Sequence, residues 1–443
     1  MISRSDKATQ TLTNSERECH QSNRQQHLGN LTIVGAGIVG LAAAIELQRE
    51  GFNVTVIDKE GAGTGASKGN AGHFATEQVF PLADATMLPK LPGMLMDPLG
   101  PFRIQPQYFL KALPWFMRFL QNMLPSRRSK NSRAIKVLNQ DAIAAMKSLA
   151  SFCGCEDLLV MNGSLLVFEG TPIEEVEKEY QAYADADIEV QLFSGEQVRA
   201  LEPSLSQHIT NGLYFTQVGH TSDPYRLCQA FEAKFRALGG NLIIEEVVEV
   251  YTSETSSNIQ LQMKSGISKN TDRLVIAAGA WSKPIAKQLG YSIPLETERG
   301  YHLMMPQKSC LSRPVASYNR KFIVTPMSDG TRLAGTVEFG GLQAPLVDAR
   351  ADCLFPHAKA LLPDLFAIAS ASDGIRWMGF RPSLPDSLPI LGRSQKQANV
   401  FFSFGHQHLG LTWSANTAKL LRQEVLGEQT TIDLGPYRID RFN

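Results

Sequence analysis

The chain has 443 residues, of which 43% are hydrophobic, and Lys+Arg and Asp+Glu balance at 43 each. This length can supply two domains with large cores. The neutral charge argues against nucleic acid as a partner, because nucleic-acid binding usually needs a basic excess. No run of about 20 apolar residues occurs, so we expect no membrane-spanning helix. The six cysteines are scattered without CxxC pairs, which favours reduced thiols in a cytoplasmic protein and predicts no metal site.

The first 30 residues are polar and aperiodic. They contain no apolar segment of the kind found in a secretory signal. We therefore expect residues 1–30 to form a flexible tail.

A glycine-rich turn follows the first apolar strand. Residues 31–58 read LTIVGAGIVGLAAAIELQREGFNVTVID, which predicts a strand, a helix and a second strand ending at Asp58. Gly35 permits the tight turn, Gly37 lets the backbone approach a pyrophosphate, and Gly40 lets the helix pack closely on the strand. Asp58 can accept hydrogen bonds from the ribose hydroxyls of an adenosine. The spacing predicts a dinucleotide-binding βαβ unit.

The segments after this unit predict further helices and strands. The small-residue loop at 61–75 should pass close to a bound nucleotide. Proline punctuates residues 81–106, which we expect to be irregular. Periodicity and capping residues predict helices over 132–152, 173–187 and 223–238, and strands over 163–168, 211–221, 242–251, 259–263 and 274–277.

Residues 107–125, QYFLKALPWFMRFLQNMLP, are rich in aromatic residues, interrupted by Pro114 and followed by the basic RRSKNSR. One interpretation is a pair of packed helices that cover a substrate domain. The other is a basic amphipathic patch that contacts a membrane surface or gives access to a quinone. The second interpretation would place a cytoplasmic protein peripherally on the inner membrane.

The identity of the dinucleotide depends on the rest of the chain. No second GxGxxG follows a strand, so we expect no separate domain for a nicotinamide cofactor. Residues 273–282, RLVIAAGAWS, predict a buried strand that runs into a small-residue turn. This segment resembles the second FAD contact of glutathione-reductase-like flavoproteins. A resident FAD is therefore expected, with electrons supplied by an organic substrate.

That resemblance implies an α/β fold with two domains. One is a discontinuous, glutathione-reductase-like Rossmann FAD domain, and the other is a sheet-based α+β substrate domain. We expect residues 31–95, 219–290 and 376–443 in the FAD-binding domain, and residues 96–218 and 291–375 in the substrate-binding domain.

Five further segments stand out along the chain: SKGNAGHFA (67–75), QVGHTSDPYRL (217–227), ETERGYHLMMP (296–306), MGFRPSLPDSLPILGR (378–393) and FFSFGHQHLGLTW (401–413). Together they resemble the D-amino acid oxidase superfamily, and the resemblance covers residues 31–426. Within the superfamily it is closest to bacterial D-amino acid dehydrogenases and to the D-hydroxyproline dehydrogenase type.

Arg381 is the main candidate for substrate binding. A planar guanidinium can hold a carboxylate through two parallel hydrogen bonds. The alternative is a structural ion pair between Arg381 and Asp386. The resemblance favours the carboxylate role, and it also places His73, Tyr301, His302 and His408 near the substrate, although Tyr301 and His302 could equally be ordinary sheet residues.

Gly405 and Gly410 flank a short segment before a predicted helix. Backbone N–H groups and a helix N-terminus there could stabilise the negative charge of a reduced flavin. We expect His406 to be satisfied by hydrogen bonds beneath the flavin rather than to act in catalysis. The expected cofactor-binding residues are Gly35, Gly37, Ile38, Val39, Gly40, Asp58, Lys59, Ser67, Asn70, Ala71, Gly72, Val248, Ala278, Gly279, Trp281, Gly405, His406, Leu409, Gly410, Leu411 and Thr412.

The resemblance implies oxidation of a D-amino acid by hydride transfer from Cα to flavin N5, giving an imine. His73 stands where the general D-amino acid dehydrogenases would have glutamine, which favours a D-proline or hydroxy-D-proline substrate. Three alternatives stay open: a glycine or sarcosine type, a broad enzyme that acts on D-alanine, and a flavin-binding subunit of a larger redox complex. The electron acceptor, whether oxygen, a quinone or a redox partner, is also left open.

Overall fold

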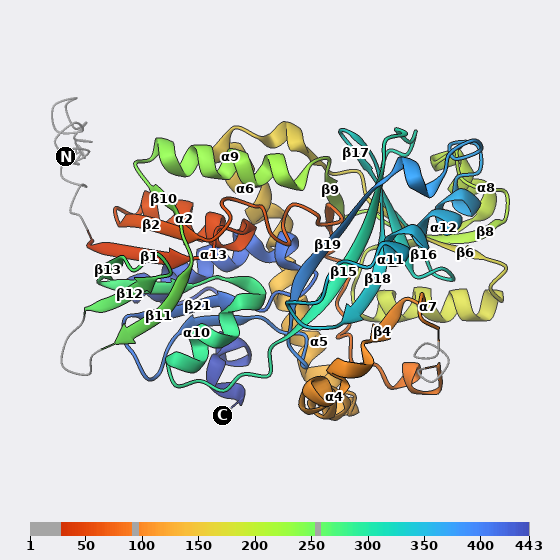
Figure 1. Cartoon of the computed structure of the whole chain (residues 1–443). Helices are drawn as coiled ribbons and strands as arrows, with labels where there is room; N and C mark the ends of the chain where they lie inside the picture. Colours follow the sequence, from red (N-terminus) through yellow and green to blue (C-terminus); the bar gives the residue numbers. More distant parts are fainter. Residues whose placement is uncertain (1–27, 91–96, 253–257, 443) are drawn as a thin grey trace, which may run out of the picture.

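The computed structural model describes residues 28–90, 97–252 and 258–442. The expected N-terminal tail, apart from residues 28–30, lies outside the described residues. Figure 1 shows two parts side by side, one with a mostly parallel sheet and helices, the other with a larger sheet. None of the helices in the described ranges is long and apolar enough to cross a membrane.

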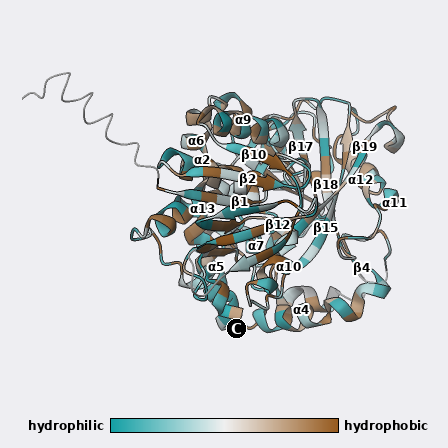
Figure 2. Ribbon diagram, turned by 60° about the vertical axis from the view of Figure 1, so that its left-hand side comes forward, coloured by the Kyte–Doolittle hydropathy of each residue, from teal (hydrophilic) through white to brown (hydrophobic). Residues whose placement is uncertain are grey.

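The first part is built on a six-stranded sheet of nucleotide-binding type. Its strands follow the order β10-β2-β1-β14-β21-β20. Neighbouring strands from β10 to β21 are parallel, and β20 runs antiparallel to β21. Figure 2 shows hydrophobic segments on β2 and β10 of this sheet. Strands β1, β14 and β21 are almost entirely buried, because both faces of the sheet are covered. The strands are β1 (Asn30–Val34), β2 (Asn53–Asp58), β10 (Asn241–Ile244), β14 (Arg273–Ile276), β20 (Ile390–Arg393) and β21 (Val400–Phe404).

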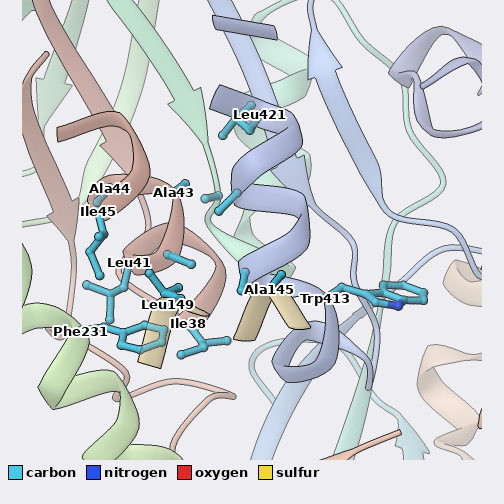
Figure 3. Close-up of a cluster of buried hydrophobic side chains, with 14 of the residues drawn as sticks. Ile38, Leu41, Ala43, Ala44, Ile45, Ala145, Leu149, Phe231, Trp413 and Leu421 are labelled. Carbon is cyan, nitrogen blue, oxygen red and sulfur yellow. The ribbon is translucent and has the colours of Figure 1, made fainter. Parts of the chain in front are cut away.

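Four helices pack together on one face of this sheet. Figure 3 shows their shared core, in which Leu41 of α2 lies beside Phe231 of α9 and Leu149 of α6. Alanines of α2 let α13 approach closely. The opposite face is covered by a small antiparallel sheet and a short helix. These elements are α2 (Ile38–Arg49), α6 (Ala142–Cys153), α9 (Pro224–Ala237), α13 (Gly410–Leu426), β11 (Val247–Thr252), β12 (Ile259–Met263), β13 (Ser268–Thr271) and α10 (Ser282–Gln288).

The second part is built on a nine-stranded sheet. Its order is β19-β15-β18-β17-β16-β6-β8-β7, with β4 added to β18. Short helices cover one face with their apolar sides, and α7 packs on a smaller cluster. The elements are β4 (Phe102–Ile104), β6 (Ser164–Glu169), α7 (Ile173–Asp185), β7 (Val190–Ser194), α8 (Gly195–Leu201), β8 (Ile209–Phe215), β15 (Glu296–Met305), β16 (Val315–Ser317), β17 (Phe322–Met327), β18 (Gly330–Phe339), α11 (Asp348–Asp352), α12 (Leu354–Leu361) and β19 (Ile375–Ser383).

A three-stranded sheet connects the two parts. β9 pairs with β3 on one side and with β5 on the other. It brings the loop after β2 next to segments that are remote in the sequence. The remaining elements are β3 (His73–Phe74), β5 (Leu159–Val160), β9 (Gly219–Thr221), α4 (Phe109–Asn122), α5 (Pro125–Gln140), and the 3-10 helices η1 (Ala85–Lys90), η2 (Pro106–Tyr108), η3 (Glu156–Leu158), η4 (Gly279–Trp281), η5 (Ala371–Asp373), η6 (Gly435–Tyr437) and η7 (Ile439–Phe442).

Several expected elements are divided in the structure. The predicted helix over 132–152 is two helices, α5 and α6. The predicted strand over 211–221 is split between β8 and β9, and that over 242–251 between β10 and β11, in each case across two sheets. Apolar periodicity continued through these breaks, so it did not reveal where the chain changes direction.

Two segments belong to a different part of the molecule from the domain to which we expected them to belong. Residues 375–383 form β19, which pairs along its length with β15 of the nine-stranded sheet. Helices α5 and α6 fall within 96–218, yet both pack on α13 of the nucleotide-binding part. Pairing and packing with remote partners decide these placements, and neither partner could be identified from local sequence.

Candidate active site

A cavity of about 700 Å³ lies between the two parts of the molecule. It starts at the carboxyl ends of β1 and β2, where Gly35 and Asp58 line it, and it reaches β16 and β18 of the nine-stranded sheet. Ligands of open α/β sheets bind at this end of the strands. The volume falls within the range of small-molecule and cofactor sites.

The glycines of the first turn leave the backbone open to this cavity. A Cβ on Gly35, which has φ +112°, would lie 2.4 Å from the carbonyl oxygen of Ala277, and one on Gly40 would lie 1.9 Å from that of Gly35. Both positions therefore exclude a side chain. A Cβ on Gly37 would meet only Ser67 Oγ, at 3.4 Å, and Ser67 Oγ accepts a 3.0 Å hydrogen bond from the backbone N–H of Ile38, the first residue of α2. Gly37 itself offers no side-chain cap, so the N-terminus of α2 presents backbone N–H groups suited to a pyrophosphate.

Asp58 is held in place at the end of β2. Its carboxylate accepts hydrogen bonds from the backbone N–H groups of Ala36, Glu60 and Gly61, at 2.8, 2.9 and 3.0 Å. Nearby, the Lys59 ammonium lies 3.8 Å from the centre of the Trp281 ring. The donor set, the glycine cradle and the carboxylate fit an adenine dinucleotide.

Most of the expected cofactor residues line the cavity. The lining includes Gly35, Gly37, Ile38, Val39, Asp58, Lys59, Ser67, Asn70, Ala71, Val248, Ala278, Gly279, Trp281, Gly405, His406, Gly410 and Leu411.

Four of the expected residues lie behind the cavity wall. Gly40 packs α2 on the turn, and Gly72, with φ +77°, lies against the carbonyl of Thr221. Leu409 is buried in the helical core. The Thr412 hydroxyl accepts a hydrogen bond of 3.0 Å from the backbone of Ala75. These four residues pack the helix and fix the loop. The structure does not place them on the surface of the cavity.

Arg381 projects into the cavity from β19. Its guanidinium lies over Gly300, where a Cβ would approach Cζ to 2.6 Å. Asp386 is paired with Arg441 at 2.7 Å, so the alternative ion pair between Arg381 and Asp386 is wrong. Within the described part of the chain Arg381 has no ion pair. Burial lowers the pKa of Arg381, and the Glu298 carboxylate opposes this shift. A cavity-lining guanidinium without a partner can bind an anionic group.

Tyr301 and His302 lie outside the cavity, contrary to expectation. The Tyr301 hydroxyl donates a 2.7 Å hydrogen bond to Glu338. His302 Nδ1 lies 3.0 Å from the carbonyl oxygen of Gly69, and its ring stacks on Trp377 with centroids 4.8 Å apart. Successive residues of a strand face opposite sides. Tyr301 therefore points to the face of the sheet away from the cavity. His302 packs behind Trp377, which lines the cavity.

His73 and His408 do line the cavity, together with two residues that the sequence analysis missed. His408 Nε2 lies 2.6 Å from Gln78 Oε1, and His73 Nε2 lies 3.6 Å from Glu77 Oε1. His73 Nε2 and Glu77 Oε2 are buried and have no hydrogen-bond partner among the described residues. Glu77 and Gln78 lie just after the loop segment that carries His73, but no motif marked them in the sequence.

His73, Glu77, Gln78 and His408 form a polar wall of the cavity, and burial determines the charge state of its titratable groups. It raises the pKa of Glu77 to about 8 and lowers the pKa of His408 to about 3. It also lowers the pKa of His73 to about 3, with His220 and His408 adding to the shift. At neutral pH the histidines are therefore neutral and Glu77 is protonated. These residues offer uncharged donors and acceptors in the same cavity as the Arg381 guanidinium.

Comparison with known proteins identifies the family. The profile described as "DAO: FAD dependent oxidoreductase" matches residues 30–424. The chain belongs to this family. It is thus an FAD-dependent oxidoreductase, and the glycine cradle and Asp58 fit that cofactor.

Individual relatives match along nearly the whole chain. A protein named D-amino-acid oxidase, from Bradyrhizobium diazoefficiens, is 34% identical over 93% of this chain and 99% of its own. A D-amino acid dehydrogenase from Vibrio atlanticus is 27% identical over the same shares. Among solved structures, glycine oxidase from Geobacillus kaustophilus has a TM-score of 0.69 at 23% identity, covering 93% of this chain and 98% of its own. The last of these shows the shared fold.

Proposed function

We propose that the enzyme oxidises a D-amino acid whose carboxylate is bound by Arg381. The observation that carries this proposal is a guanidinium in the cavity that has no ion pair within the described residues. The D-amino-acid oxidase that is 34% identical to this chain supports the substrate class. FAD, when bound, accepts a hydride from the substrate Cα.

The residues of the cavity would bind and orient the substrate. A bidentate pair with Arg381 fixes the carboxylate and limits rotation of the substrate. His73 and His408 are neutral at this end of the cavity, so they add no positive charge to those of Arg381 and Lys321. No further charged group is needed to hold an amino acid whose side chain is neutral.

The polar wall favours a substrate that carries a hydroxyl group, such as a hydroxylated D-proline. Glu77 and His73 each present an unpaired polar atom in a buried position. A ring hydroxyl can both donate and accept, so it could satisfy a protonated carboxyl and a neutral imidazole together. A site built for such a hydroxyl penalises substrates that lack it, because its own polar groups then stay unpaired.

Anaerobic flavin bleaching tests this function. The panel contains hydroxylated D-proline, D-proline, D-alanine, glycine, sarcosine and the L-enantiomers. We expect hydroxylated D-proline to give a higher kcat/KM than D-proline, and both to exceed D-alanine. Equal or faster bleaching by D-alanine, glycine or sarcosine would contradict the proposed substrate. If none of the compounds bleaches the flavin, the chain acts as a flavin-binding subunit instead.

The same preparation compares electron acceptors. After bleaching by the best substrate, the reduced enzyme is mixed with oxygen or with a soluble quinone analogue. Faster reoxidation by oxygen identifies an oxidase, and faster reoxidation by the quinone identifies a dehydrogenase. A slow reaction with both indicates a protein redox partner.

A further inference from the structure

The segment from residue 98 to residue 140 differs in charge from the rest of the chain. It contains no Asp or Glu, whereas the whole protein has 43 acidic and 43 basic residues. A local excess of this kind creates a positive field over one region of the surface. The basic residues are Arg103, Lys111, Arg118, Arg127, Arg128, Lys130, Arg133 and Lys136.

Helix α4, within this segment, has one packed face and one exposed apolar face. On the packed face, Trp115 and Phe116 each lie 5.1 Å, centroid to centroid, from Phe339 at the end of β18. Figures 1 and 2 both show α4 at the lower edge of the molecule, with no element beneath it. The exposed face carries apolar side chains at helical spacing: Leu110 (78% exposed), Leu113 (39%), Met117 (53%) and Leu120 (42%). Leu124 (53%), between α4 and α5, is exposed as well.

Exposed basic residues lie on α4 and at the start of α5, which follows it in the chain. Lys111 and Arg118 belong to α4, and Arg127, Lys130 and Arg133 to the start of α5. None of the five forms an ion pair within the described ranges. Other basic residues of the segment do form ion pairs: Arg128 with Asp84 at 2.8 Å, and Lys136 with Asp187 at 2.6 Å.

We propose that this surface, α4 together with residues 125–133 of α5, binds the interface of a bilayer that contains anionic lipids. The exposed leucines and Met117 would enter the headgroup region, and the unpaired basic residues would contact the lipid phosphates. The positive charge of this surface favours an anionic bilayer, rather than a second copy of the chain, as its binding partner. A symmetric dimer through α4 would bring the two sets of five unpaired cations together without a counter-charge.

Vesicle co-sedimentation of the full-length holoenzyme tests the proposal. The vesicles are phosphatidylcholine alone, or phosphatidylcholine with about one third phosphatidylglycerol. One variant, Leu110→Ser/Met117→Ser, removes apolar area from the exposed face. A second variant, Lys111→Gln/Arg118→Gln, removes two charges and keeps the apolar face. The matched control is Ile368→Ser, since Ile368 is fully exposed and belongs to neither α4 nor α5.

The wild type should bind the anionic vesicles and dissociate as the salt concentration rises. Each neutralised basic residue should weaken binding about fivefold, and the double serine variant should weaken it by about tenfold or more. The control should bind like wild type, and all variants should keep the flavin spectrum and the bleaching rate. Equal binding to both kinds of vesicle, or no binding to either, would overturn the proposal. It would also fail if wild type sedimented as a dimer that the serine variant converted to monomer.

Discussion

The two ends of the cavity are constructed differently. At the nucleotide end, the glycine-rich backbone of the βαβ unit forms part of the wall, and three nearby backbone N–H groups hold Asp58 in place. At the substrate end, the wall consists of side chains from separate segments, including His73, Glu77, Arg381 and His408. Burial lowers the pKa of His73 and of His408 and raises the pKa of Glu77.

This difference separates binding of a common cofactor from selection of one substrate. Backbone N–H groups and glycines recognise phosphate regardless of what lies further along the cavity. Buried, unpaired side chains are costly unless a ligand satisfies them, so they discriminate between ligands. Substitutions at the nucleotide end should therefore abolish function, whereas those at the substrate end should change its selectivity or pH dependence.

Gly37→Val should have the largest effect. A branched side chain at this position would occupy the space in which the pyrophosphate approaches α2, so we expect purified protein with no bound FAD. The ratio of flavin to protein absorbance measures this. Gly37→Ala is the control, since its Cβ would meet only Ser67 Oγ at 3.4 Å, and it should fold and retain part of the FAD. Full FAD occupancy in the valine variant would contradict the role of this turn.

The difference between the two ends of the cavity also explains which parts of the site could be predicted from the sequence. The βαβ unit is contiguous, so glycine spacing located Gly35, Gly37 and Asp58 correctly at the cavity. The substrate end forms only when β3 pairs with β9 and β19 pairs with β15. Pairing sets which side of a strand faces the cavity, and it places Tyr301 on the side away from it. Glu77 carried no recognisable motif, and its significance comes from burial, which depends on the whole fold.

Arg381→Lys should have the second largest effect. A lysine keeps the charge but cannot reproduce the bidentate pair with a carboxylate. We expect a loss in kcat/KM for the best substrate equivalent to about 2–4 kcal/mol, with FAD content and thermal stability unchanged. Steady-state kinetics and flavin melting curves measure the two quantities. A variant with wild-type kcat/KM would show that the carboxylate binds elsewhere.

Glu77→Gln should change how stability depends on pH. The folded-state pKa of about 8 lies above the ordinary value of 4.5, so Glu77 contributes less stability as pH rises towards 8. The buried histidines act in the opposite sense, because their lowered pKa values cost stability only below about pH 6.5. Between about pH 6.5 and 8 the wild-type holoenzyme should lose up to about 2 kcal/mol. The glutamine variant should show a smaller fall in Tm over that interval, the remainder coming from Glu298, whose pKa burial also raises. An unchanged slope would mean that Glu77 is ionised.

His73→Gln should have the smallest effect and tests selectivity most directly. Glutamine is the residue expected here in general D-amino acid dehydrogenases, and it would alter the hydrogen bonding offered to a ring hydroxyl. The preference for hydroxylated D-proline over D-alanine should fall about tenfold, which is the equivalent of one hydrogen bond in a buried site. His302→Gln is the matched control, because His302 stacks on Trp377 outside the cavity. If both variants change the substrate preference equally, the change comes from a general disturbance of the cavity wall and not from His73 alone. A shift confined to His73→Gln would locate the hydroxyl beside His73 and Glu77, where the unpaired polar atoms lie.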